Sequence, residues 1–152
     1  MKAIIIILLC VVLSACATVK EDSHISVTTS NVAAASPVEK VEVYHFHGTN
    51  QCSSCIAVGK LAEETVNAYF ADELKTGKVA FAHINYDLLE NKELASKYGV
   101  TGSSLWIGVY DKQGFHAEQN TNVWYKINNK KDYMDYLKET IEQKLSRGFA
   151  IG

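Results

Sequence analysis

Two cysteines separated by two serines, Cys52 and Cys55, constrain this chain more than any other feature. They lie between the β-branched and aromatic run 41–47 and an amphipathic run that begins at Ile56. The first run favours a strand, and the second has apolar residues at the spacing of one helical face. A thiol at such a strand-to-helix turn lies near unpaired N–H groups at the positive end of the helix, which stabilises a thiolate. Because the thiolate is the reactive form, the pattern indicates thiol–disulfide chemistry.

The first 15 residues have the pattern of a secretory signal. Lys2 precedes the apolar run 3–13, which is shorter than the ~20 residues that span a bilayer. Leu-Ser-Ala then precedes Cys16, and this arrangement resembles a bacterial lipobox. The resemblance implies cleavage before Cys16 and lipidation of its thiol; a plain secretory signal and an uncleaved anchor are the alternatives. Ala17 in place of aspartate resembles the signal for transfer to the outer membrane, if the cell has two membranes.

The cysteine count then leaves a single pair. Cys10 lies in the signal and Cys16 is assigned to lipid, so Cys52 and Cys55 are the thiols free to pair. The signal predicts a compartment outside the cytoplasm, where disulfides persist. A bridge that closes so short a loop restrains the unfolded chain little, which weighs against a purely structural role.

The predicted organisation is a signal peptide at 1–15, a lipidated N-terminus and flexible tether at 16–37, one domain at 38–146 and a tail at 147–152. The tether is rich in Ser, Thr, Ala and Asn and ends at the only proline, Pro37; its alternative is a short extra strand at 25–29. His24 in the tether and His116 are assigned to solvent. With 15 basic and 17 acidic residues and no basic stripe, the composition argues against a nucleic-acid partner.

Within the domain, strands and helices are expected to alternate. Strands are predicted at 41–47, 78–86 and 105–110, and a turn at 111–114 leads to a hairpin strand at 115–119. Helices are predicted at 56–70, 88–98 and 131–145. Ser53 or Ser54 is expected to cap the first, whose helical region ends at Gly77, and Gly99 is expected to end the second. The segment 120–129 is hard to assign. Trp124 and Tyr125 within it are expected to pack under the last helix, with a place at the rim of the site as the alternative; Trp106 is expected in the core. This order predicts an α/β fold with a mixed sheet and helices on both faces.

The element order, with Cys-x-x-Cys after the first core strand, resembles the thioredoxin fold. The stretches 81–87 and 93–102, the latter ending Tyr-Gly-Val-Thr-Gly, are similar to the thioredoxin segment that leads to the active-site loop. The chain also resembles a small thioredoxin-like family labelled ArsF-like. The resemblance covers residues 38–146 and implies a three-layer sandwich with protein-disulfide oxidoreductase activity.

The chain departs from thioredoxins around the cysteines. Ser104 stands where thioredoxins have a cis-proline that faces the disulfide, and the usual Trp and Gly-Pro are replaced by Gln51 and the two serines. The buried Asp and Lys beneath the disulfide correspond to His45 and His83.

By this alignment the imidazoles of His45 and His83 lie under Cys55. His45 is the stronger candidate to take the proton from Cys55 as it attacks a mixed disulfide. The alternative is a pair of buried histidines that hydrogen-bond one another or a backbone carbonyl. His47 is expected to cover the loop before Cys52, with a charge effect on that thiol or metal binding as alternatives.

The leading hypothesis is a membrane-tethered, extracytoplasmic thiol–disulfide oxidoreductase. Cys52 is the nucleophile, Cys55 resolves the mixed disulfide and His45 assists. No dissociable cofactor is expected, because the cysteines carry the electrons, and the expected partner is a protein disulfide or dithiol. One alternative is a copper- or zinc-binding protein that uses the cysteine pair with nearby histidines. Another is a redox-silent interaction domain on a lipid anchor.

Overall fold

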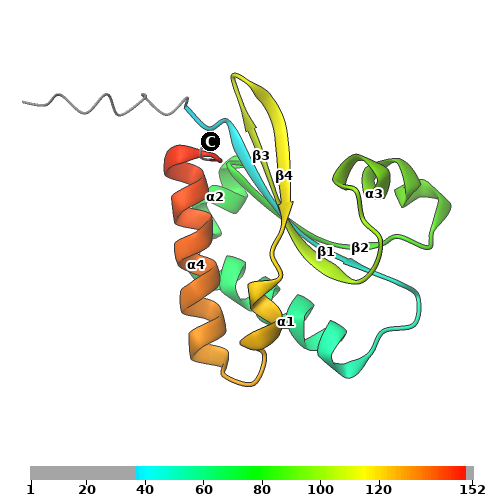
Figure 1. Cartoon of the computed structure of the whole chain (residues 1–152). Coiled ribbons are helices and arrows are strands. Elements are labelled where there is room, and N and C mark those ends of the chain that lie inside the picture. The colour runs from blue at the N-terminus through cyan, green and yellow to red at the C-terminus, as the bar shows by residue number, and fades with distance from the viewer. Residues whose placement is uncertain (1–36, 150–152) are drawn as a thin grey trace, which may run out of the picture. The chain divides into compact units, whose positions relative to one another are not determined.

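A mixed sheet flanked by helices makes up residues 37–149, the part of the chain that the computed structural model describes. The predicted signal peptide, Cys16, most of the tether and the alternative strand at 25–29 lie outside these residues. The elements in chain order are β1 (Lys40–His47), α1 (Ser53–Tyr69), α2 (Ala71–Thr76), β2 (Val79–Asn85), η1 (Leu89–Asn91), α3 (Lys92–Tyr98), β3 (Ser104–Asp111), β4 (Gly114–Gln119), η2 (Asn122–Tyr125) and α4 (Lys130–Arg147), where η denotes a 3₁₀ turn (Figure 1).

The strand order is β2-β1-β3-β4. β1 and β2 are parallel and are joined through α1 and α2, whereas β3 pairs antiparallel with both β1 and β4. The predicted mixed sheet is therefore confirmed. The register places His45 of β1 directly opposite His83 of β2, so two of the candidate side chains share one face of the sheet.

Successive side chains of β1 point to opposite faces of the sheet and contribute to two separate hydrophobic layers. Val41 and Val43 face the core that α1 and α4 cover, whereas Phe46 belongs to a smaller cluster with Tyr98 of α3. Figure 1 shows α3 on the opposite side of the sheet from α1 and α4. The expected three-layer arrangement is confirmed, and the main core lies beneath α1, next to the cysteine pair.

The predicted helical region after the cysteines is divided in two. Phe70 leaves helical geometry, with φ −128° and ψ 29°, and separates α1 from α2. Its side chain is 3% exposed and belongs to the main core, so burial of the ring outweighs continuation of the helix. Gly77, with φ 74°, ends α2 as predicted, because glycine adopts this left-handed conformation without strain.

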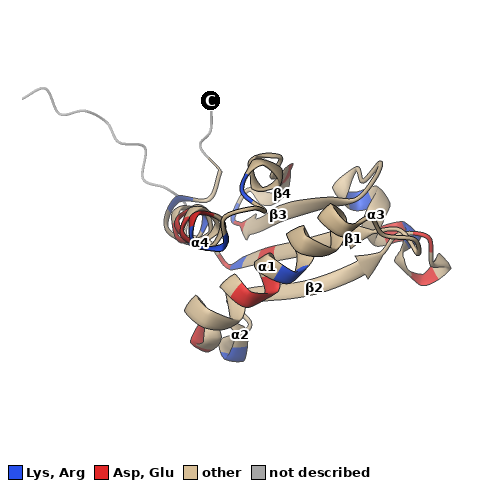
Figure 2. Ribbon diagram, turned by 90° about the horizontal axis from the view of Figure 1, so that it is seen from below, with Lys and Arg blue, Asp and Glu red and all other residues tan. Residues whose placement is uncertain are grey.

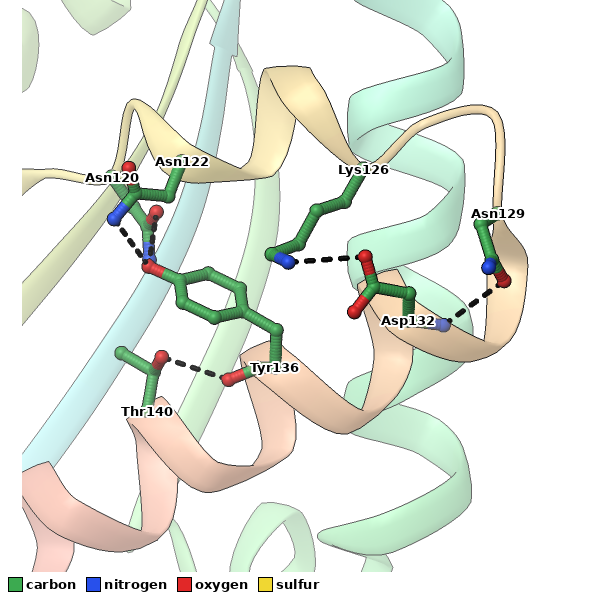
Figure 3. A network of polar contacts seen from close by, with 7 residues as sticks. All are labelled: Asn120, Asn122, Lys126, Asn129, Asp132, Tyr136 and Thr140. Atoms are coloured by element: carbon green, nitrogen blue, oxygen red, sulfur yellow. Dashed lines mark hydrogen bonds and ion pairs between the residues drawn. The ribbon is translucent and has the colours of Figure 1, made fainter.

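The segment that the sequence left unassigned is held against α4 by polar contacts (Figure 3). The Tyr136 hydroxyl donates to Asn120 Oδ1 at 3.0 Å and accepts from Asn122 Nδ2 at 3.2 Å. Lys126 Nζ pairs at 3.0 Å with Asp132, which lies one turn before Tyr136 on α4. These contacts fix η2 although it has no strong helical pattern of its own.

The two aromatic residues of η2 have different environments. Trp124 packs against the main core, as predicted, but Tyr125 is 86% exposed, so the prediction that it packs under α4 was wrong. The 3₁₀ turn directs successive side chains about a third of a turn apart, so neighbours cannot both face the core.

Basic and acidic residues both occur along the helices (Figure 2). Lys130 pairs with Glu64 at 2.7 Å and Lys138 with Glu142 at 2.8 Å. Surface pairs of this kind contribute about 0–1 kcal/mol each, so the apolar layers supply most of the stability. No helix between residues 37 and 149 combines the length and the apolar character that crossing a membrane requires.

Glu42 is a buried carboxylate on the α3 face of β1. It is 5% exposed and accepts hydrogen bonds from the Tyr98 hydroxyl at 2.6 Å and from Lys40 Nζ at 2.8 Å. Burial alone would raise the pKa of Glu42, but the hydrogen bonds from Lys40, Tyr98 and Tyr44 outweigh it and hold the pKa below its ordinary value of 4.5. Glu42 therefore stabilises the fold in its charged form.

Because the pKa of Glu42 is lower in the folded state, its contribution is present above pH 4.5 and is lost as the pH falls through the folded pKa. We expect Glu42→Gln to lower the free energy of unfolding by about 1–3 kcal/mol at neutral pH, and by less in acid. Urea denaturation at both pH values measures this. Glu118→Gln, at an exposed partner of Lys144, is the control and should have little effect. An equal loss for Glu42→Gln at both pH values would contradict the role of the charge.

Candidate active site

Cys52 and Cys55 form a disulfide at the point where the chain enters α1. Their Cα atoms are 5.0 Å apart, and the bond spans the first turn of the helix. Cys52 is exposed, whereas Cys55 is 9% exposed and contributes to the buried layer. The pair that the sequence singled out is thus brought together, with Cys52 at the surface and Cys55 nearly buried.

Cys52 is itself the N-terminal cap of α1. Its Sγ accepts a hydrogen bond from the Cys55 backbone N–H at 3.0 Å, so the prediction that Ser53 or Ser54 caps the helix was wrong. The helix begins at Ser53, whereas a cap at Ser53 would have started it at Ser54 or later. The earlier start is possible because the Cys52 sulfur accepts the hydrogen bond of the Cys55 N–H, a first-turn donor. An anionic sulfur at this position would accept the same hydrogen bond at the positive end of the helix.

The loop before Cys52 is fixed by the end of β2. Asp87 Oδ2 accepts a hydrogen bond from the Thr49 backbone N–H at 2.7 Å, and Asn85 Nδ2 donates to Thr49 Oγ1 at 3.1 Å. The hydrogen bond from the Thr49 N–H holds the pKa of Asp87 below its usual value. A side chain at Gly48 would contact Tyr86 Oη at 3.1 Å, so a residue without one suits this close approach. The loop that presents Cys52 is therefore positioned by β2.

Three histidines gather on the α1 face of the sheet, beneath the start of the helix. The His45 ring centroid lies 5.4 Å from that of His47, in a stacked arrangement, and 5.2 Å from that of His83. His45 is 1% exposed, and its Nδ1 lies 3.0 Å from His83 Nδ1. His47 Nδ1 contacts the Gly48 carbonyl oxygen at 2.9 Å, which agrees with its expected place against the loop. His116, assigned to solvent, has a side chain that is 48% exposed.

Gly59 makes room for the His45 ring. A Cβ at this position of α1 would lie 2.3 Å from His45 Nδ1, well inside van der Waals contact. The sequence analysis did not single out Gly59. A glycine inside a helix lowers helix stability by about 1 kcal/mol relative to alanine. Its presence in a helical pattern was therefore the sequence signal that could have indicated a packing role.

His45 is neutral near pH 7. Burial lowers its pKa to about 4, and the neighbouring His83 and His47 act in the same direction. The Cys55 carbonyl oxygen lies close enough to favour the charged form and partly opposes the shift. The Nε2 atom of His45 is buried and, among the described residues, has no hydrogen-bond partner of standard geometry. A buried polar atom without a partner costs stability, so it calls for a functional reason.

Ser104 is occupied within its own segment. It is 2% exposed, its hydroxyl donates to the Gly102 carbonyl at 2.8 Å, and Trp106 Nε1 donates to Ser104 Oγ at 2.9 Å. Trp106 is half-buried beside Tyr98 and Phe46 rather than fully in the core. The Ser104 hydroxyl therefore orders the turn into β3.

The cysteines and the nearby histidines do not form a metal-binding group in the disulfide form. Across residues 37–149, no group of three or more His, Cys, Asp or Glu side chains is arranged to hold one. The two sulfurs are bonded to each other, and two of the three histidine rings share a hydrogen bond. The copper- or zinc-binding alternative needs the two thiols free and stays a hypothesis.

No family model matches the chain, and the search of curated proteins found no match. Similar solved structures include the Trx4 domain of ERdj5, which is 16% identical over 72% of this chain and 86% of that one, with a TM-score of 0.44. Oxidized thioredoxin O2 from Arabidopsis thaliana is 14% identical over 69% and 75%, with a TM-score of 0.43. The first two thioredoxin domains of Naumovozyma dairenensis Eps1p are 15% identical over 66% and 34%, with a TM-score of 0.42.

These TM-scores are low, so the fold is assigned from the chain's own architecture. The strand order, the helices on both faces and the disulfide at the junction of β1 and α1 are the deciding features. A thioredoxin-like fold with a close cysteine pair supports thiol–disulfide oxidoreductase activity. The ArsF-like label and the lipidation of Cys16 stay predictions. Residues 37–149 thus have a thioredoxin-like α/β fold.

Proposed function

We propose that the protein is a membrane-tethered, extracytoplasmic thiol–disulfide oxidoreductase that acts on protein disulfides or dithiols. One observation carries the proposal. The Sγ of the exposed residue Cys52 accepts the first-turn N–H of α1, whereas its partner Cys55 is almost buried. This asymmetry suits a nucleophile that meets the substrate and a second thiol that waits for the mixed disulfide.

The reaction consists of two exchanges. The Cys52 thiolate attacks one sulfur of a substrate disulfide, forms a mixed disulfide and releases the other substrate sulfur as a thiolate. Cys55 then loses its proton and attacks the Cys52 sulfur, which re-forms the Cys52–Cys55 bond and releases the second substrate thiolate. The substrate gains two electrons and the cysteine pair loses two. In the opposite direction the same steps oxidise a substrate dithiol.

His45 is the proposed acceptor of the Cys55 proton. Its ring lies against the first turns of α1, near the Cys55 carbonyl, and its Nε2 is buried without a partner of standard geometry among residues 37–149. With a pKa of about 4, His45 is neutral at working pH and has a free lone pair. The nearby Cys55 carbonyl oxygen favours the charged ring once a proton has arrived.

A purely structural disulfide explains this arrangement less well. The sequence separation of the two cysteines is 3, and a loop this short adds little to stability through the unfolded state. An exposed sulfur at a helix end is also more open to attack than a structural bridge needs to be.

The cellular location rests on the sequence before the domain. The apolar run 3–13 and Leu-Ser-Ala before Cys16 support export and attachment of a lipid to Cys16. In a cell with two membranes, Ala17 favours the periplasmic face of the outer membrane. There the domain would meet exported proteins, whose disulfides persist outside the cytoplasm.

Two measurements test the two halves of the proposal. The reduced protein should cleave a peptide disulfide that links a fluorophore to its quencher, and the oxidised protein should leave it intact. In cells, the protein should fractionate with membranes, whereas Cys16→Ser should lose the lipid mass and leave the membrane fraction. Cys10→Ser is the control and should remain with the membranes. Retention of Cys16→Ser would contradict the tether, and absence of cleavage would contradict the activity.

A further inference from the structure

A small polar cavity lies where the end of β4, η2 and α4 meet, on residues that the proposed thiol–disulfide exchange does not use. Its volume is about 190 Å³, and its lining is almost wholly polar. We call it the amide cavity, after Asn120 and Asn122, which line it together with Tyr136 and Thr140 (Figure 3). Pockets that enclose drug-sized ligands measure ~300–1,000 Å³, so this one has room for a ligand of about one ring.

Asn120 is the most deeply buried residue of the lining. It is 6% exposed, and its backbone N–H donates to the Leu105 carbonyl at 2.8 Å, which ties it to β3. Its side-chain Oδ1 accepts a hydrogen bond from the Tyr136 hydroxyl at 3.0 Å, but its Nδ2 has no acceptor among residues 37–149. Burial of an amide donor without a partner costs stability, so this donor at the cavity calls for a ligand.

The Tyr136 hydroxyl sets the orientation of both amides. Its single hydrogen goes to Asn120 Oδ1, and it accepts a hydrogen bond from Asn122 Nδ2 at 3.2 Å. One amide therefore spends its oxygen on the hydroxyl and the other spends its nitrogen. Within the described part of the chain, the groups left over are a donor, Asn120 Nδ2, and an acceptor, Asn122 Oδ1. Thr140 Oγ1 donates to the Tyr136 carbonyl at 2.8 Å and can still accept.

The amide cavity is already formed without a ligand. Asn120 is held between β3 and Tyr136 of α4, and Tyr136 in turn is linked to Asn122 of η2. A ligand therefore does not have to order these side chains, and the entropy cost of binding is lower than for mobile groups.

The charges at the cavity are already paired. Glu118, the carboxylate of the lining, pairs with Lys144 at 2.8 Å, and the nearby Lys126 pairs with Asp132 at 3.0 Å. The lining thus presents no lysine or arginine to an anion such as phosphate. It also lacks the apolar wall that an apolar side chain would need. A neutral ligand rich in hydroxyl groups fits best, because each hydroxyl both donates and accepts.

We propose that the amide cavity binds one pyranose unit of a neutral saccharide. One ring hydroxyl accepts from Asn120 Nδ2, a neighbouring hydroxyl donates to Asn122 Oδ1, and Thr140 Oγ1 can accept from a third. Tyr136 is a positioning residue, since its own hydroxyl is occupied by the two amides. The binding is non-covalent and goes beyond the oxidoreductase function, because none of these residues belongs to the candidate active site.

Nuclear magnetic resonance of the side-chain amides tests the proposal. The isotope-labelled full chain, with Cys10 and Cys16 replaced by serine, is titrated separately with D-glucose, D-galactose and N-acetyl-D-glucosamine. Inorganic phosphate and a neutral tripeptide with blocked ends are the anionic and peptide probes. Asn120→Ala and Asn122→Ala are compared with Asn128→Ala, which removes an exposed asparagine of the same connection outside the cavity.

We expect at least one of the three sugars to shift the side-chain amide signals of Asn120 and Asn122 saturably, with a dissociation constant in the millimolar range. Asn120→Ala and Asn122→Ala should each weaken binding about three- to tenfold, the effect of losing one hydrogen bond. In each variant the remaining asparagine reports the binding. Asn128→Ala should bind like the parent, and phosphate and the tripeptide should leave both signals unchanged.

Three results would overturn the saccharide site. The first is the absence of a shift with all three sugars. The second is a sugar affinity of Asn122→Ala equal to that of the parent; Asn122 is exposed, so this variant decides the matter even if Asn120→Ala fails to fold. The third is a response of the two signals to phosphate or to the tripeptide but to none of the sugars, which would assign the cavity to another class of ligand.

Discussion

Cys55→Ala is expected to accumulate a stable mixed disulfide between Cys52 and substrate, whereas Cys52→Ala is expected to lose turnover completely. The difference follows from the site, where the exposed Cys52 meets the substrate and the buried Cys55 meets only Cys52. Without Cys55 the first exchange still occurs, but no second thiol is close enough to release the product. Without Cys52 the remaining thiol is 9% exposed and lacks the cap position.

Mass spectrometry after reaction with a peptide disulfide measures this outcome. Cys55→Ala should gain the mass of one peptide chain, Cys52→Ala should gain none, and the unmodified pair should return to its own disulfide. Ser53→Ala is a matched control between the two cysteines, and it should turn over normally because Ser53 does not cap the helix. Equal trapping by the two cysteine variants would mean that the sulfurs are equivalent, against the roles assigned here.

Gly59→Ala is expected to destabilise the fold by about 1–3 kcal/mol, the usual cost of overpacking a filled core. The helix alone would favour alanine by about 1 kcal/mol, so the sign of the result decides which effect dominates. The clash should dominate, since a Cβ at this position would lie 2.3 Å from His45 Nδ1. The ring cannot move aside easily, because it is 1% exposed and is hydrogen-bonded to His83.

Urea denaturation of a double-mutant cycle with His45→Ala isolates this contact. With the ring removed, Gly59→Ala should become neutral or stabilising, and the coupling between the two positions should exceed about 1 kcal/mol. Gly77→Ala does not serve as a control, because Gly77 has a positive φ. Ala62→Gly, at a buried position one turn further along α1, measures the helix effect without the ring. Additive effects of the Gly59 and His45 substitutions would contradict the packing role.

The elements near the site could be predicted because each has a strong local signal. β-branched and aromatic residues give β1, and the cysteine pair marks the start of α1. The adjacency of His45 and His83 followed from neighbouring strands, and the register confirms it. Gly77 and Gly99 end helices as expected, because each adopts a left-handed conformation that other residues avoid.

The rest depended on how elements pack, which local patterns do not encode. The break at Phe70 results from burial of its ring, and the contact of Glu63 with His83 depends on the rotation of α1 over β2. The exposure of Tyr125 likewise follows from the polar contacts that hold η2. Of the missed residues, only Gly59 left a signal in the sequence, as a glycine where the helix prefers another residue.

The most direct test is a redox titration of the cysteine pair. The full chain, with Cys10 and Cys16 replaced by serine, is equilibrated with mixtures of reduced and oxidised glutathione and quenched in acid. Free thiols are then alkylated, and mass spectrometry gives the fraction of chains with a reduced cysteine pair. An exchanging pair should give one two-electron transition between dithiol and disulfide, with a midpoint between about −120 and −270 mV, the range of thiol–disulfide oxidoreductases. A pair that stays oxidised in every mixture, with a potential below about −300 mV as in structural disulfides, would contradict the account.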